Sequence, residues 1–309
     1  MAEYSNDYNV VKRMFWDGKT DGKTYRLDKD GVKHSLFRAL RDYTARTEKK
    51  KEGETTASSE KMLAALEKQG FVDVFENYFS STVLKQTEYD KWHHEQCKKF
   101  INIIKSSKIR NDVSYGKSQK IVNMTMKTIY CLDGAEEKAK KGYFDHCHMP
   151  LDSFTLEWFR TEVAQNWYNP TKIKACKIKI SQEGGSLPKW SKLEFKKGSL
   201  SDDFNTYDTD SITREENGKY HYMFFVTMIR EYFKSTNNHY KDLTPFQAEF
   251  YIWPEIQWEM IAENLYKQDL INKIKVNRGV STNNSKINKL CGDLMKQITE
   301  MLTVYKEER

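Results

Sequence analysis

The sequence has no apolar run long enough to cross a membrane. A membrane-spanning helix needs about 18 or more consecutive apolar residues, and the 309-residue chain contains no such run. The polar segment Met1 to Tyr8 also lacks the apolar core of a signal peptide. We therefore expect a cytoplasmic protein that does not contact a membrane.

Cysteines are few and scattered. The chain has 5 of them, an odd number, and no two form a CxxC pair. They are Cys97, Cys131, Cys147, Cys176 and Cys291. This usage is typical of a reducing compartment and argues against a disulfide framework, so we expect free thiols.

Signatures of several common enzyme classes are also absent. The sequence contains no Gly-x-x-x-x-Gly-Lys phosphate loop, no GxGxxG, no GxSxG and no HExxH motif. These absences argue against most nucleotide hydrolases and against zinc-dependent peptidases of the HExxH type.

What the sequence has is positive charge and aromatic residues. The 51 Lys and Arg residues exceed the 44 Asp and Glu residues, which gives a formal net charge of +7, and 13% of the residues are aromatic. Such a balance favours contact with polyanions. It favours a nucleic acid as the partner, while the oligomeric state stays open.

Apolar residues recur mostly at helical spacing, so the predicted fold is mainly α, a multi-helix orthogonal bundle. The longer predicted helices are Glu88 to Ser107, Lys117 to Leu132, Asp152 to Tyr168, Tyr220 to Phe233, Pro245 to Lys267 and Ile287 to Tyr305. We expect an N-terminal helical region at 1–110 and a helical core at 111–309, or one domain comprising both. The alternating segment Thr171 to Ile180 predicts a strand and places a small β insertion at 171–218.

Several segments interrupt this pattern. Glu48 to Ser59 is charged and lacks large apolar residues, which predicts an exposed loop, and Ser199 to Gly218 predicts a longer one. Asp133 to Lys141 is predicted to be a charged connector. Pro254 predicts an interruption of the helix in which it stands.

The first local motif is the segment Tyr115 to Asn123, in which Gly116 opens a helix and Lys117 lies beside it. Backbone N–H groups at a helix start, with lysines nearby, can hold a phosphate. The alternative is an ordinary helix start with solvated lysines. In the later segment Met149 to Phe154, Asp152 is most simply the N-cap of the next helix.

Together these segments resemble the helix-hairpin-helix DNA glycosylases related to endonuclease III. In that family a glycine-containing hairpin enters a helix of the form K-T-A-N, and a later P-V-D-T-H segment supplies an aspartate. Lys120-Ile121-Val122-Asn123 is similar to the first element and Pro150-Leu151-Asp152-Ser153 to the second. The resemblance covers about residues 115–155, with Asp133 to Lys141 as an insertion between the two elements.

The resemblance implies an enzyme that flips a base and cleaves its N-glycosidic bond, in DNA repair or in defence. Lys120 would attack the sugar C1′, and Asp152 would stabilise charge on the sugar or activate the attacking group. Gly116, Lys117 and Ser118 would contact the DNA backbone, and the chemistry needs no magnesium and no organic cofactor. The alternative function is a non-catalytic helical module that binds nucleic acid or a protein.

Two further features of the sequence involve possible metal ligands and aromatic residues. His93-His94-x-x-Cys97 and His146-Cys147-His148 contain potential zinc ligands, yet packing explains them more simply, so we expect no metal. The aromatic residues between Tyr220 and Trp258 are expected to be core, whereas Trp190 is the better candidate for an exposed, DNA-contacting aromatic.

Overall fold

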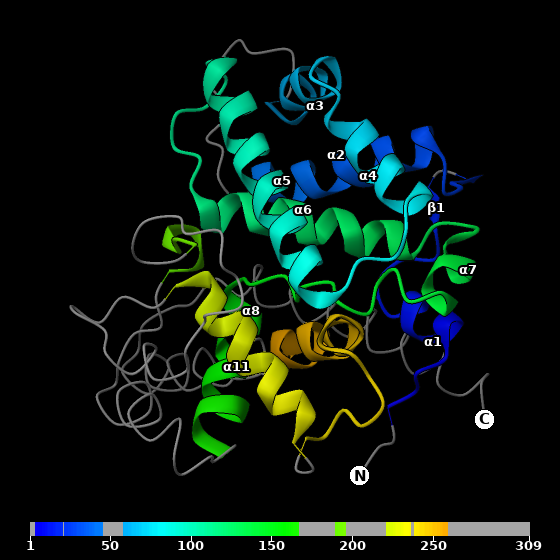
Figure 1. Ribbon diagram of the computed structural model, residues 1–309, viewed down its shortest axis with the longest axis vertical. Coiled ribbons are helices and arrows are strands. Elements are labelled where there is room, and N and C mark those ends of the chain that lie inside the picture. The colour runs from blue at the N-terminus through cyan, green and yellow to red at the C-terminus, as the bar shows by residue number, and fades with distance from the viewer. Residues whose placement is uncertain are drawn as a thin grey trace, which may run out of the picture. The chain divides into compact units, whose positions relative to one another are not determined.

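The computed structural model describes residues 4–20, 22–45, 58–166, 189–195, 221–235 and 238–258 of the chain. The chain separates into two compact units, Met1–Pro254 and Glu255–Arg309. The first unit contains almost all of the described residues and is drawn in Figure 1.

The predicted mainly α fold is confirmed. The helices in chain order are α1 (Tyr8–Arg13), α2 (Lys29–Ala45), α3 (Ser58–Lys68), α4 (Phe71–Ser80), α5 (Gln86–Ser106), α6 (Tyr115–Tyr130), α7 (Ala135–Lys140), α8 (Ser153–Trp158) and α11 (Tyr222–Lys234). A π-helix, η1 (Phe159–Asn166), continues α8, a single 3-10 turn forms η2 (Trp190–Lys192), and residues 245–258 are also helical.

The strands of the described residues lie at the N-terminal end of the chain. β1 (Lys19–Thr20) pairs with β2 (Lys23–Thr24) in an antiparallel hairpin that the sequence analysis did not predict. Most of the predicted β insertion at 171–218, with its strand, and the predicted helix at 287–305 lie outside the described residues. The described part of that insertion, 189–195, contains η2 and no strand.

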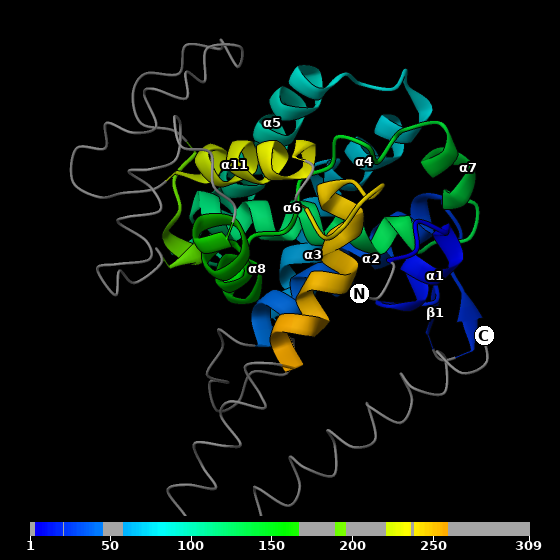
Figure 2. The same ribbon diagram turned by 90° about the horizontal axis from the view of Figure 1, so that it is seen from below.

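α6 is the central helix of the first unit. α2 and α5, which precede residue 110, both pack against it (Figure 1, Figure 2). Of its 16 residues, 13 are buried, including several polar ones. Because a buried polar group is costly unless it has a partner, these side chains determine what must pack around α6.

Three local predictions were wrong. The connector at 133–141 contains α7, whose Glu136 and Lys140 form an i, i+4 ion pair of 2.9 Å. Of the loop predicted at Glu48 to Ser59, residues 48–57 lie outside the described residues, and Ser58 and Ser59 belong to α3. The helix at 245–258 continues past Pro254, although proline has no N–H to donate to the carbonyl of Phe250. Among the described residues, no helix combines the length and apolar content required to cross a bilayer.

Candidate active site

Two lysines of α6 point into the protein from one face of the helix. Lys120 and Lys127 are seven residues apart, which is about two helical turns. Their side chains are 5% and 2% exposed. A buried ammonium group is stable only when it is paired, and each lysine has a carboxylate partner.

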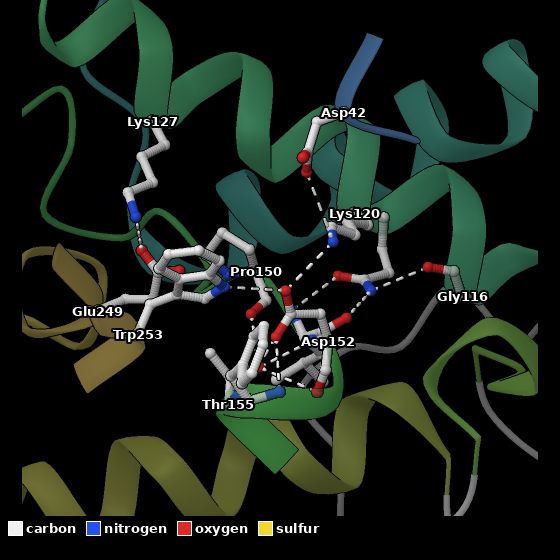
Figure 3. Close-up of polar contacts among 12 residues, drawn as sticks. Asp42, Gly116, Lys120, Lys127, Pro150, Asp152, Thr155, Glu249 and Trp253 are labelled. Atoms are coloured by element: carbon white, nitrogen blue, oxygen red, sulfur yellow. Dashed lines mark hydrogen bonds and ion pairs between the residues drawn. The ribbon is translucent and has the colours of Figure 1, made fainter. Parts of the chain in front are cut away.

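Lys120 is paired with Asp152. Its Nζ lies 3.1 Å from Asp152 Oδ2 and 3.6 Å from Asp42 Oδ2 on α2, and Figure 3 shows it between these two carboxylates. The ammonium group also lies over the ring of Trp190, 5.1 Å from the ring centroid. The structure therefore brings together three residues that the sequence analysis named or placed nearby: Lys120, Asp152 and Trp190.

Asp152 is also the N-cap of α8, as predicted. Its Oδ1 accepts hydrogen bonds from the N–H groups of Phe154 (2.9 Å) and Thr155 (3.2 Å). Its own N–H donates to Thr155 Oγ1 at 2.8 Å, which completes a capping box. Oδ2 accepts from Lys120 and from the indole N–H of Trp253, each at 3.1 Å.

These partners determine the charge of Asp152. Burial raises the pKa of its carboxyl group, but the charge and hydrogen bond of Lys120, the Thr155 N–H and the Trp253 N–H outweigh it, and the pKa is lowered. Asp152 is therefore an anion held between a cation and an indole.

Lys127 is paired with Glu249, which the sequence analysis did not single out. Glu249 lies in the helix at 245–258, its side chain is 0% exposed, and its Oε2 forms an ion pair with Lys127 Nζ. Lys127 Nζ also lies 4.3 Å and 4.7 Å from the ring centroids of Phe15 and Phe250. Burial raises the pKa of Glu249 to about 7, with a further rise from Asp152, although Lys127 opposes it.

Both ion pairs border one pocket, whose volume is about 390 Å³. Its charged and aromatic wall is formed by Arg38, Arg41, Asp42, Asp152, Glu249 and Trp253, together with Lys127 and Phe15. Lys120 is not among the residues that line the pocket, but its ammonium group is paired with two carboxylates that do, those of Asp42 and Asp152. The pocket thus combines carboxylates, cations and an aromatic surface.

The start of α6 does not offer a phosphate site in this arrangement. The N–H of Gly116 donates to Leu193 O at 2.9 Å, and those of Lys117 and Ser118 donate to Ser114. Lys117 Nζ forms an ion pair with Asp112. The turn N–H groups at 116–118 are therefore used within the chain, and the expected contact of these residues with the DNA backbone stays a prediction.

Gly116 serves packing instead. A Cβ at this position would lie 1.9 Å from the carbonyl oxygen of Trp190 and 3.1 Å from the N–H nitrogen of Leu193. The glycine lets η2 approach α6 closely, and this approach places Trp190 against Lys120. Trp190 is half-buried rather than exposed.

Gln119 fixes the loop that carries Asp152. Its side-chain amide donates to Leu151 O at 2.8 Å and accepts from the Leu151 N–H at 3.3 Å. Asn123, one turn later, donates to Gln119 Oε1 at 3.0 Å and to the Tyr222 hydroxyl at 3.0 Å. α6 thus binds both Asp152 and the backbone beside it.

The two His/Cys clusters do meet, but as part of a hydrogen-bond network. The rings of His93 and His148 are 4.4 Å apart. His148 contacts Asp90 at 2.6 Å and the Tyr222 hydroxyl at 2.8 Å, and Arg230 donates two hydrogen bonds to Asp90 at 2.8 Å and 2.7 Å. Burial raises the pKa of Asp90, but His148 and Arg230 outweigh it and hold the pKa well below its usual range. Within the described part of the chain, no three His, Cys, Asp or Glu side chains are placed to hold a metal ion.

Comparison of the chain with protein-family models, with curated proteins and with solved structures gives no match. The functional argument therefore depends on the residues of this chain and their contacts.

The sequence pattern did not single out Lys127, Glu249 or Trp253 as site residues. The available signals were the seven-residue spacing of the two lysines and the single acidic residue in the aromatic run Phe246 to Trp253.

Proposed function

We propose that the pocket beside Lys120 and Asp152 is the active site of a DNA-acting, glycosylase-like enzyme that cleaves the N-glycosidic bond of a flipped base. The observation that carries the proposal is the buried Lys120–Asp152 pair, whose charged atoms are 3.1 Å apart and whose aspartate lines a pocket together with Trp253. An amine beside a carboxylate is the pairing that attack on a sugar carbon requires.

The reaction uses these two groups in sequence. Asp152 takes a proton from the ammonium group of Lys120, and the free amine bonds to C1′ as the C1′–N bond breaks and its electron pair leaves with the base. The C1′–O4′ bond then breaks as one proton of the bonded amine moves to O4′, which opens the sugar ring and leaves an iminium ion, a protonated Schiff base, between Lys120 and C1′. This proton transfer removes the charge of both partners, so it also releases the amine from its ion pair with Asp152.

The charge of the protein and the aromatic face of Trp253 support DNA as the substrate. The net charge of +7 favours a polyanion. Arg38 and Arg41 line the pocket, and guanidinium groups pair well with phosphate. Trp253 supplies an aromatic face on which a flipped base can stack.

Borohydride trapping tests this function. The purified protein is incubated with labelled duplexes that carry an abasic site or one of a panel of modified bases, and sodium borohydride reduces any Schiff base to a stable adduct. Wild type should form the adduct and Lys120→Gln should not, while both bind DNA. A parallel base-release assay detects a reaction in which water replaces the lysine as nucleophile.

One observation favours a non-catalytic nucleic-acid- or protein-binding module instead. Both oxygens of Asp152 already have partners, because Oδ1 caps α8 and Oδ2 binds Lys120 and Trp253. Under this alternative the pair only stabilises the fold. The expected result is then no adduct, no released base, and salt-sensitive binding that Lys120→Gln barely changes.

A further inference from the structure

Three carboxyl groups from the described part of the chain line the pocket, those of Asp42, Asp152 and Glu249, and the side chain of Glu249 is fully buried. Glu249 lines the same pocket as Asp152. Its Oε2 lies in an ion pair with Lys127, and neither of its carboxyl oxygens has a partner in hydrogen-bond geometry among the described residues. A buried polar atom without a partner is rare and calls for an explanation.

The position of Glu249 links it to the site already described. Trp253, which donates to Asp152, is four residues after Glu249 on the same helix, so the two side chains share one face. Lys127 lies two turns after Lys120 on α6, so these two side chains also share one face of their helix. Figure 3 shows the two ion pairs side by side, with Trp253 between Glu249 and Asp152.

We propose that Glu249 is the general acid that protonates the leaving base. This inference rests on the proposed function and adds to it the residue that completes departure of the base. Bond cleavage at C1′ puts an electron pair on the base, and a proton on Glu249 Oε1 transfers to a ring nitrogen as that charge develops. The carboxylate left behind is stabilised by Lys127, and it regains a proton from water that enters the pocket once the base has left.

The surroundings divide the two carboxyl groups between two roles. The pKa of Asp152 is lowered by Lys120, whereas burial raises the pKa of Glu249 to about 7. Two carboxyl groups whose pKa values are pushed apart in one site are the usual arrangement of a base and an acid. The charged groups that face Glu249 are Lys120 and Lys127 on α6, Asp152 before α8, and Arg38, Arg41 and Asp42 on α2.

A general acid implies a class of substrate. A neutral purine is a poor leaving group until one of its ring nitrogens is protonated. A purine alkylated at N7 already carries a positive charge and needs no proton from the enzyme. We therefore expect neutral purine bases to be the substrates for which Glu249 matters.

The test compares two purines under single-turnover conditions, one neutral and one cationic. Duplexes that carry hypoxanthine or N7-methylguanine are incubated with wild type and with Glu249→Gln, and base release is measured. Loss of the acid should slow hypoxanthine release by about 10²- to 10⁴-fold and leave N7-methylguanine release nearly unchanged. The wild-type rate on hypoxanthine should also fall as the pH rises above about 7.

A second variant guards against misfolding. Glu249→Gln leaves Lys127 without its anion, so Lys127→Met combined with Glu249→Gln removes both charges, and thermal unfolding shows which variant is folded. Equal slowing of both purines would overturn the role of Glu249, and so would a wild type that releases only N7-methylguanine. A wild type that releases neither purine and traps no adduct would instead overturn the proposed function itself.

Discussion

The indole N–H of Trp253 donates a hydrogen bond to the same oxygen of Asp152 that binds Lys120, each at 3.1 Å. Trp253 and Asp152 are 101 residues apart in the sequence. The hydrogen bond joins the helix at 245–258 to the start of α8 at the wall of the pocket. An anion that receives an ammonium group and an indole N–H at one oxygen is fixed in both position and charge.

Trp253→Phe removes this donor and keeps an aromatic ring. We expect a loss of about 1.5–3 kcal/mol in the free energy of unfolding, the usual value for a hydrogen bond to a charged group. The pKa of Asp152 should rise, because one of the groups that lower it is gone. Urea unfolding and NMR titration of the aspartate carboxyl groups measure the two effects.

Trp158→Phe is the matched control. Trp158 is buried, but its indole nitrogen has no hydrogen-bond partner among the described residues. This variant should lose packing energy and leave the titration of Asp152 where it is in wild type. The finding would be contradicted if the two variants moved the Asp152 titration equally.

Asp152→Asn tests the ion pair separately from the cap, because asparagine is also a good N-cap. The variant leaves Lys120 with only the more distant Asp42, so at pH 7 we expect a loss of about 3–5 kcal/mol. Asp112→Asn removes the exposed partner of Lys117 and should cost less than about 1 kcal/mol.

The stability difference between wild type and Asp152→Asn should depend on pH. The pKa of Asp152 is lower in the folded protein than its ordinary value of 3.8, which applies to the unfolded protein. The ionised carboxylate therefore stabilises the fold fully at pH values above 3.8. This stabilisation is lost as the pH falls toward the pKa of the folded protein. The gap in unfolding free energy between wild type and Asp152→Asn should therefore narrow below about pH 4. A gap that stays constant between pH 3 and 7 would show that Asp152 acts only as a cap.

Gly116→Ala tests the close approach of η2 to α6. Alanine is the better helix former by about 1 kcal/mol, but its Cβ would lie 1.9 Å from Trp190 O, a backbone atom that cannot rotate away. The clash should dominate and cost about 1–3 kcal/mol net.

Gly134→Ala is the comparison for that variant. Gly134 has a φ of +82°, and a Cβ there would meet no atom within 4 Å. Only the cost of the left-handed backbone applies, about 1–2 kcal/mol. Fluorescence quenching by iodide should show tryptophan more exposed in Gly116→Ala but unchanged in Gly134→Ala, and unchanged quenching in both would mean that Trp190 does not depend on Gly116.

The sequence was sufficient for features that depend on local periodicity. The bounds of helices α5, α6 and α11 were predicted to within about two residues, because they follow from the spacing of apolar residues. Asp152 was predicted as the cap of α8, because one capping side chain is enough to indicate a helix start. α7 was missed although Ala135 to Lys140 consists of strong helix formers. The high charge of this segment indicated a connector, although its residues favour a helix.

Features that depend on distant contacts could not be read from the sequence. Glu249 stands in an aromatic run that indicates only core, and nothing local shows that it meets Lys127. Gly116 looked like part of a phosphate-binding turn, and its packing role appears only when Trp190 lies against it. The candidate pair Lys120 and Asp152 came from a resemblance between motifs, and the structure places the two side chains in contact.

Glu249→Gln should change the pH dependence of stability in the opposite sense to Asp152→Asn. The pKa of Glu249 is raised from 4.5 to about 7 in the folded protein, so between these values the folded state holds a proton that the unfolded state releases. Wild type therefore loses stability from this group as the pH rises through that interval, by about 3 kcal/mol in total. Glutamine does not titrate, so the unfolding free energy of wild type relative to the variant should fall by about this amount between about pH 4 and 8. Glu231→Gln, at the exposed pair with Lys234, should change stability by less than about 1 kcal/mol. A gap for Glu249→Gln that does not change with pH would show that this carboxyl group is ionised throughout, and an ionised Glu249 has no proton to give to a leaving base.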